Sequence, residues 1–194
     1  MVIRVNNLLN VPHMLETLIS SKTRIKLLLK FFLNSNTTAY LRSLETEFGE
    51  STNAIRLELN RLEDAGMLAS FTDGNKKMFR ANTGHPLFKE IHNIILKTIG
   101  LDQVVLNVIE RLGDLEQVFL VGEFAKGNDS PIIDLIFIGS IDKTYLVNVV
   151  ERVGGLIKRK IRYLIYERDE FELVSLKLNP SFDSESLLLW SKSY

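Results

Sequence analysis

The chain has 194 residues, of which 45% are hydrophobic and 25% are charged, and it contains no cysteine. This composition is that of an ordinary globular protein and excludes disordered, collagen-like and membrane-spanning classes. The absence of cysteine excludes a disulfide scaffold, a cysteine-ligated metal site and a thiol nucleophile. The N-terminal sequence MVIRVNNLLNVP has no long apolar run, so we expect no secretory signal and a cytoplasmic protein.

The formal net charge is zero, but the two halves of the chain differ in sign. Residues 1–97 hold 13 Lys and Arg against 9 Asp and Glu, a net charge of +4. Residues 98–194 hold 11 against 15, a net charge of −4. The asymmetry favours two domains with different partners, the basic one being the candidate for binding a polyanion.

Three helices are expected in the first half, because apolar residues recur there at helical spacing. They cover residues 15–33 with a break at Ser20-Ser21, residues 40–48, and residues 52–65. Ser21 and Ser51 are suited to be N-caps, and Gly49 and Gly66 to end the helices that precede them.

A β-hairpin is expected next. The short β-prone runs 68–71 and 77–80 flank Thr72–Lys76, in which Asp-Gly is a hairpin signal. A linking helix is expected over 87–99, and we place the domain boundary near residues 98–100. Helix, short helix, turn, helix and hairpin is the order of a winged helix-turn-helix.

The second half alternates helices and strands. Helices are expected over 101–112 (ended by Gly113-Asp114), 143–158 and 168–178, and strands over 117–121, 132–138 and 160–166. The strand IIDLIFI carries one charge, Asp134, and follows a glycine-bounded turn, Gly122–Gly127. Strands and helices around a buried sheet indicate an α/β or α+β domain.

The helix over 52–65 has two chemically different faces. At about 100° per residue, Ile55, Leu59 and Leu62 cluster on the inward side. The residues expected on the outward side or at the exposed N-terminal turn are Asn53, Arg56, Asn60 and Thr52. Arg can pair with guanine and Asn with adenine in the major groove, each through two hydrogen bonds. A solvated polar face is the alternative, and the nearby acids Glu58, Glu63 and Asp64 oppose DNA binding.

Basic residues around this helix are candidates for contacting phosphate. They are Arg61 on the helix itself, Lys76 and Lys77 at the hairpin tip, and Arg42 and Lys22 on the preceding helices.

The runs LISSKTRIKLLLKFFLN, AYLRSLETEF, STNAIRLELNRLEDAGMLASFTDGNKKMFRAN and HPLF resemble the winged-helix domain of ArsR-like bacterial and archaeal transcriptional regulators, from Leu15 to about Phe88. The resemblance implies that the helix over 52–65 enters the major groove and that the protein is a homodimer on a palindromic site. In one variety of these regulators, the domain is fused to a minimal nucleotidyltransferase-like domain.

The segment VFLVGEFAKGNDSPIIDLIFIG resembles the signature of the polymerase-beta-like nucleotidyltransferase superfamily, within a resemblance from about Leu101 to Leu178. In that signature Gly-Ser opens a helix that holds a triphosphate. Asp-x-Asp, with a third carboxylate on a neighbouring strand, holds two Mg²⁺ ions. Gly122, Gly127 and Asp134 match it, whereas Glu123 replaces the serine and Ile132 the first aspartate. The strand KIRYLIY offers no carboxylate.

These departures predict that the second domain has lost two-metal catalysis, and we expect no catalytic residue, metal site or cofactor. Asp134 is expected beside the turn, hydrogen-bonded to backbone N–H groups or paired with Lys126. The dispersed histidines His13, His85 and His92 are expected at the surface or at helix ends. The basic cluster Lys158, Arg159, Lys160 and Arg162 is expected to be a solvated helix end, with a second phosphate contact as the alternative.

The sequence therefore predicts an α+β protein, an N-terminal winged helix-turn-helix (1–97) followed by a small α/β nucleotidyltransferase-like domain (98–194). The predicted function is DNA-binding transcriptional regulation on double-stranded DNA as a homodimer. The second domain is expected to serve dimerisation, partner binding or ligand sensing. Alternatives are a nucleotidyltransferase with displaced metal ligands (Asp129, Asp134, Glu167) and a protein-interaction module. The effector, if any, stays open.

Overall fold

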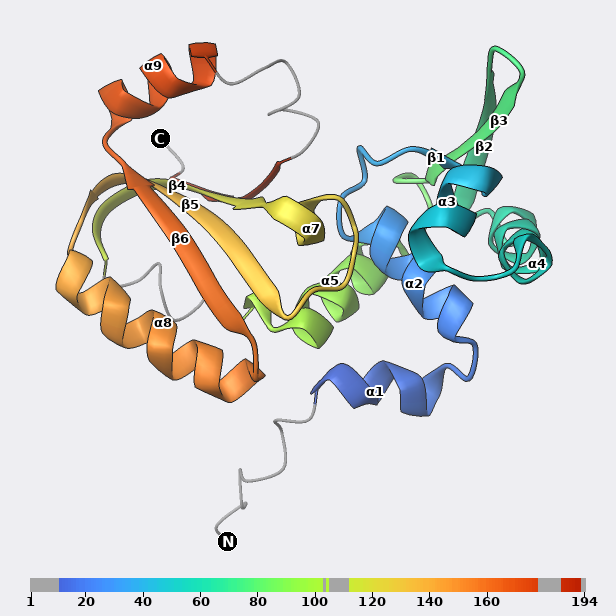
Figure 1. The fold of residues 1–194 in the computed structure, drawn as a ribbon, viewed down its shortest axis with the longest axis horizontal. Coiled ribbons are helices and arrows are strands. Elements are labelled where there is room, and N and C mark those ends of the chain that lie inside the picture. The colour runs from blue at the N-terminus through green and yellow to red at the C-terminus, as the bar shows by residue number, and fades with distance from the viewer. Residues whose placement is uncertain (1–10, 103, 105–111, 178–185, 193–194) are drawn as a thin grey trace, which may run out of the picture. The chain divides into compact units, whose positions relative to one another are not determined.

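The computed structural model describes residues 11–102, 104, 112–177 and 186–192. Contacts divide the chain into two compact units (Figure 1). Pro12–Leu96 with Gly127–Asp129 form what we call the N-terminal unit, and Lys97–Lys126 with the described residues from Ser130 onward form the C-terminal unit. Each unit combines helices with its own sheet, so the α+β class expected from the sequence is confirmed.

The helices of the first half lie where the sequence predicts them, except that α1 begins at Val11, before the expected start at residue 15. They are α1 (Val11–Leu18), α2 (Lys22–Phe32), α3 (Leu41–Phe48), α4 (Thr52–Asp64) and α5 (Phe88–Ile99). The hydroxyl of Ser21 accepts a hydrogen bond from the backbone N–H of Arg24 at 3.2 Å, and Ser51 caps α4 through Ala54 in the same way. Gly49, with φ of 63°, ends α3 in the left-handed conformation that glycine favours.

A three-stranded antiparallel sheet follows the order β1-β3-β2, with β1 (Ala39–Tyr40), β2 (Leu68–Asp73) and β3 (Lys76–Ala81). The hairpin turn is shorter than expected, because Asp73 pairs with Lys76 and only Gly74 and Asn75 remain in the turn. Gly74 has φ of 55°, as the first central position of a type II′ turn requires. Strand β1 was not predicted, since two residues cannot show a period of two.

The core of the N-terminal unit confirms the inward face predicted for α4. Ile55, Leu59 and Leu62 are no more than 4% exposed, and Phe31 and Phe32 of α2 are fully buried. Apolar burial of this kind stabilises by about 1.5–3 kcal/mol per large side chain. The contact of α4 with α2, α3 and β2 therefore fixes which side of α4 faces solvent.

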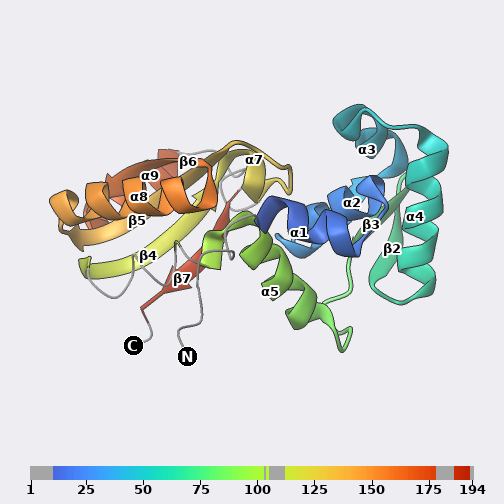
Figure 2. The ribbon, with the colours of Figure 1, turned by 90° about the horizontal axis from the view of Figure 1, so that it is seen from below.

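The C-terminal unit is built on a four-stranded mixed sheet of order β6-β5-β4-β7. Its strands are β4 (Gly113–Val121), β5 (Ile132–Ile141), β6 (Lys160–Tyr166) and β7 (Leu187–Ser191), and its helices include α7 (Gly122–Ala125), α8 (Lys143–Ile157) and α9 (Arg168–Lys177). Strand β4 runs antiparallel to β5 and β7, whereas β5 and β6 are parallel and joined by α8. Figures 1 and 2 show α8 and α9 on opposite sides of this sheet. The arrangement is compatible with a small α/β nucleotidyltransferase-like fold.

The C-terminal unit differs from the expectation at two strands. Strand β4 begins at Gly113, before the expected start at Gln117, and Gly113 pairs with Ile141. Strand β7 was not predicted, because its run of three leucines does not alternate with polar residues. Of the helix expected over 101–112, Leu101, Asp102 and Val104 are helical, and residues 103 and 105–111 lie outside the described residues.

Within the part of the chain that the structure describes, no helix is long and apolar enough to cross a membrane.

Candidate functional site

The outward face of α4 presents the three side chains predicted to read bases. Asn53, Arg56 and Asn60 are all exposed, and within the described residues their side chains form no hydrogen bond or ion pair. Leu57 beside them is 50% exposed. Buried apolar residues on one side and unengaged polar residues on the other leave this face available to a ligand.

Four more of the predicted DNA contacts are engaged inside the molecule. Arg61 lies 3.2 Å from Oε1 of Glu58, and Lys77 lies 2.7 Å from Oε2 of Glu63. The hydroxyl of Thr52 donates to Glu45 at 3.3 Å. The ammonium of Lys76 lies 4.6 Å from the centre of the Tyr40 ring, a cation–π distance.

Glu58 is not on the exposed flank of α4, as the sequence suggested. It is 5% exposed and accepts hydrogen bonds from Arg24 of α2 at 2.8 Å and from Arg61. Burial alone would raise the pKa of Glu58, but the hydrogen bonds from Arg24 and Ser21 and the two arginine charges outweigh it and lower the pKa. This acid ties α4 to α2 and does not repel a ligand on the outward face.

Glu63 faces the hairpin. Hydrogen bonds from Lys77 and from Ser70 lower the pKa of Glu63, and the charge of Lys77 adds to the effect. Lys77 and this acid therefore form a neutral pair at neutral pH. Sequence spacing alone could not reveal the pair, because 14 positions separate the two residues.

In the C-terminal unit, Asp134 pairs with Arg162. Nε and one terminal nitrogen of Arg162 donate to the two carboxylate oxygens of Asp134 at 2.6 and 2.9 Å. The residues are register neighbours on β5 and β6, so their side chains lie on the same face of the sheet. Asp134 raises the pKa of Arg162 above its ordinary value, through hydrogen bonding first and charge second. The pairing of Asp134 with Lys126 that the sequence suggested is wrong.

Gly122 is packed against the same carboxylate. It has φ of 71°, and a Cβ atom there would lie 2.7 Å from Oδ2 of Asp134. Glu123 follows it, exposed, in the short helix α7. Gly127, with φ of 80°, is grouped with the N-terminal unit.

The residues on this face do not fit two divalent cations. Ile132 stands two positions before Asp134, and the guanidinium of Arg162 already binds the single carboxylate. Glu167 lies five positions after Arg162, the register partner of Asp134, so it is roughly 16 Å along the strands from Asp134. Among the described residues, no group of three or more His, Asp or Glu could hold a metal ion.

The basic cluster after α8 is not a simply solvated helix end. Arg159 donates to the carbonyl oxygen of Ser130 and lies 5.0 Å from the centre of the Phe124 ring. Two of the cluster's four cations, Arg159 and Arg162, thus hold local structure. Of the histidines, His92 lies 2.7 Å from the carbonyl oxygen of Phe32 through Nδ1, and His85 accepts from the N–H of Leu87. The side chain of His13 is outside the described part.

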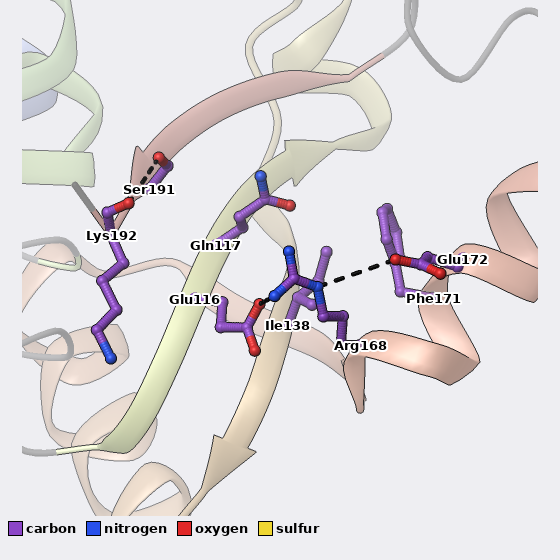
Figure 3. Close-up of a pocket in the computed structure, with 8 residues that line it drawn as sticks. All are labelled: Glu116, Gln117, Ile138, Arg168, Phe171, Glu172, Ser191 and Lys192. Carbon is purple, nitrogen blue, oxygen red and sulfur yellow. Dashed lines mark hydrogen bonds and ion pairs between the residues drawn. The ribbon is translucent and has the colours of Figure 1, made fainter. Parts of the chain in front are cut away.

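A pocket of about 380 Å³ that the sequence did not predict lies on the α9 side of the sheet (Figure 3). Its lining residues are Glu116, Gln117, Ile138, Arg168, Phe171, Glu172, Ser191 and Lys192. Arg168 stands between the two glutamates, 3.4 Å from Glu116 and 3.9 Å from Glu172. No motif marks these residues, because they come from three strands and a helix far apart in the sequence.

Comparison with known proteins leaves the family open. No protein-family model matches the chain, and no curated protein matches it. Three chains of solved structures match, two of them from crystal structures of mutants of the toxin–antitoxin MntA-HpeT. One is 10% identical, covering 48% of this chain and 73% of that one with a TM-score of 0.35. The other is 9% identical, covering 47% and 73%, with a TM-score of 0.36. Likeness at this level decides neither fold nor activity.

Proposed function

We propose that the chain is a DNA-binding transcriptional regulator whose N-terminal unit, as a winged helix-turn-helix, inserts α4 into the major groove of double-stranded DNA. One observation carries the proposal: Asn53, Arg56 and Asn60 are exposed side by side and unengaged within the described residues, on a helix whose opposite face is buried. Arg and Asn are the side chains that bind guanine and adenine through two hydrogen bonds.

The contacts divide into two roles. Asn53, Arg56 and Asn60 read bases, and Thr52 stands at the N-terminal turn of α4. Lys76, Lys22 and Arg42 meet phosphates and set the position on the duplex. Arg61 and Lys77 contribute less than their charge suggests, because Glu58 and Glu63 neutralise them.

The C-terminal unit, as a degenerate nucleotidyltransferase-like domain, acts without two-metal catalysis and serves dimerisation, partner binding or ligand sensing. This part of the proposal is supported by the Arg162 guanidinium on Asp134, where a metal site needs an accessible carboxylate. A homodimer on a palindromic site is the assembly that such a regulator would form.

The test is fluorescence anisotropy of the full chain with duplexes from its own upstream region and with random duplexes, over a salt series. We expect tight binding to one duplex, a steep fall with salt, and a loss of about tenfold to a thousandfold in Arg56→Ala/Asn60→Ala. Lys89→Ala is the matched control, because it removes one exposed charge of the same unit from α5.

Two results would contradict the proposal. If Arg56→Ala/Asn60→Ala binds the preferred duplex as Lys89→Ala does, α4 does not read bases. If the wild type binds no duplex at low salt, the N-terminal unit does not act on DNA, and docking to another protein becomes the leading function.

A further inference from the structure

The solvent side of the three-stranded sheet carries a row of large side chains, which we call the outer face. Tyr40 and Phe71 both pair with Met78, so the three side chains cross β1, β3 and β2 on one side. The neighbouring Phe79 points to the opposite side and is 4% exposed. Phe71 is 39% exposed, so part of an aromatic ring lies open to solvent.

Two cations flank this row. Lys76 and Arg80 stand two positions before and after Met78 on β3 and share its side of the sheet. The Lys76 ammonium lies 4.6 Å from the centre of the Tyr40 ring, and the Arg80 guanidinium carbon lies 5.5 Å from that of Phe71. Both cations are exposed, and Asp73 at the tip is the one acid among the outward-facing positions of the described strands.

Side chains alternate between the two faces of a strand, so Lys77 lies on the opposite side of β3 from Lys76 and Arg80. Lys77 points to the inner side and is held by Glu63 at 2.7 Å. The cations that remain for a ligand therefore lie beside aromatic rings and apart from other carboxylates, except at the hairpin tip.

We propose that the outer face binds single-stranded nucleic acid, with unpaired bases stacking on Tyr40 and Phe71 and with Lys76 and Arg80 contacting phosphates. Stacking needs bases whose flat faces are open, which a duplex does not offer. Aromatic platforms beside cations are the combination that binds single strands with little sequence preference. An acidic peptide would use the cations but not both rings. The inference goes beyond duplex reading and uses neither Arg56 nor Asn60.

The test is anisotropy of fluorescein-labelled 20-mers of thymidylate and of uridylate with the full chain. We expect Phe71→Leu to weaken binding by about 5- to 100-fold, because it removes one stacking platform. Phe71→Tyr keeps a ring and should retain wild-type binding. Arg80→Gln should weaken binding at low salt, whereas Lys89→Gln, of equal charge change on α5, should not. Asp73→Asn should strengthen it.

Four results would overturn the proposal. The first is that the wild type binds neither 20-mer at low salt, and the second is that an abasic 20-mer binds as tightly as the thymidylate strand. The third is that Phe71→Leu, verified as folded by circular dichroism, binds like the wild type. The fourth is that a poly-glutamate peptide competes as well as the unlabelled strand. Comparing the two 20-mers tells DNA from RNA. Arg56→Ala/Asn60→Ala should keep the affinity for single strands. A failure of the duplex proposal can therefore be distinguished from a failure of this one.

Discussion

Glu58 shows how one buried side chain fixes the orientation of a helix. Its side chain is 6% exposed, and the carboxylate is held by Arg24 of α2 and by Arg61 of its own helix. A buried carboxylate is tolerated only when it is paired, and removing its partner or its charge leaves the rest of the network unsatisfied. The network fixes the rotation of α4 about its own axis, which keeps Arg56 and Asn60 in solvent.

We predict that Glu58→Gln destabilises the N-terminal unit by about 1–3 kcal/mol at pH 7, because it weakens charge-assisted hydrogen bonds to two arginines. The folded state lowers the pKa of Glu58 below its ordinary value of 4.5. Its stabilisation is therefore complete above about pH 4.5 and is lost as the pH falls through the lower, folded-state pKa. The difference between variant and wild type should shrink at pH 3.

Hydrogen exchange of α4 amides, compared at equal pH, measures this effect locally. Glu90→Gln on α5 is the control for removing an exposed acid. A destabilisation by Glu58→Gln that is as large at pH 3 as at pH 7 would show that packing, not charge, is responsible.

Arg162 lies directly opposite Asp134 on the neighbouring strand β6. We predict that Ile132→Asp/Arg162→Asp gains a divalent-cation site, because three carboxylates would then share one sheet face with Asp134. A dissociation constant for Mn²⁺ on the order of 1 mM or tighter is expected, measured by electron paramagnetic resonance.

The matched control for the metal site is Ile132→Asp alone. It adds the same carboxylate but keeps the guanidinium on Asp134, so it should bind Mn²⁺ no better than the wild type. Equal binding by the single and double variants would mean that Arg162 does not block the site.

At the scale of elements, the sequence predicted those helices and strands that have a periodic apolar pattern or a capping residue. Helices α2, α3 and α4 and strand β6 lie where apolar spacing, Ser21, Ser51 and Gly49 place them. The two-residue β1 and the run of leucines in β7 lack the alternation of apolar and polar residues from which a strand is predicted. The candidate base readers follow from α4's helical geometry, whereas the ion pairs on Arg162, Lys77 and Glu58 depend on residues 14 to 34 positions away.

Gly139 on β5 lies very close to the backbone of β4. It has φ of 131°, and a Cβ there would clash with the carbonyl oxygen of Asp114, where the register shifts between Leu115 and Gln117. We expect Gly139→Ala to lower the free energy of unfolding of the C-terminal unit by about 3 kcal/mol or more. Urea unfolding followed by the fluorescence of Trp190, on β7, measures it.

The control for Gly139 is Gly155→Ala on the exposed side of α8. Its Cβ would meet nothing within 4 Å, and its φ is not in the left-handed region. Alanine should there stabilise the unit by about 0.5–1 kcal/mol, because helix interiors favour it over glycine. If both variants shift stability in the same direction by similar amounts, close packing at Gly139 is not the cause.

At the scale of the whole molecule, a net charge of zero hides a sign change between residues 1–97 and 98–194. A polyanion is attracted by the local field within about 10 Å at 0.1 M salt, so the total charge says little about nucleic-acid binding. Nucleic-acid binding depends instead on which cations are already neutralised by acids of the same chain. Arg42 of α3 is exposed and has no side-chain partner among the described residues, whereas Lys77 is held by Glu63.

The salt dependence of duplex binding should separate these two cations. Each phosphate contact adds about 0.9 to the slope of log K against log salt concentration. We expect Arg42→Ala to reduce the slope by about that amount, and Lys77→Ala to leave it nearly unchanged, because Lys77 is neutralised by Glu63 before DNA arrives. Anisotropy from 50 to 300 mM KCl, on the same duplex for both variants, measures the slopes. An equal reduction by the two variants would mean that the Glu63–Lys77 pair opens on binding and that Lys77 contacts phosphate.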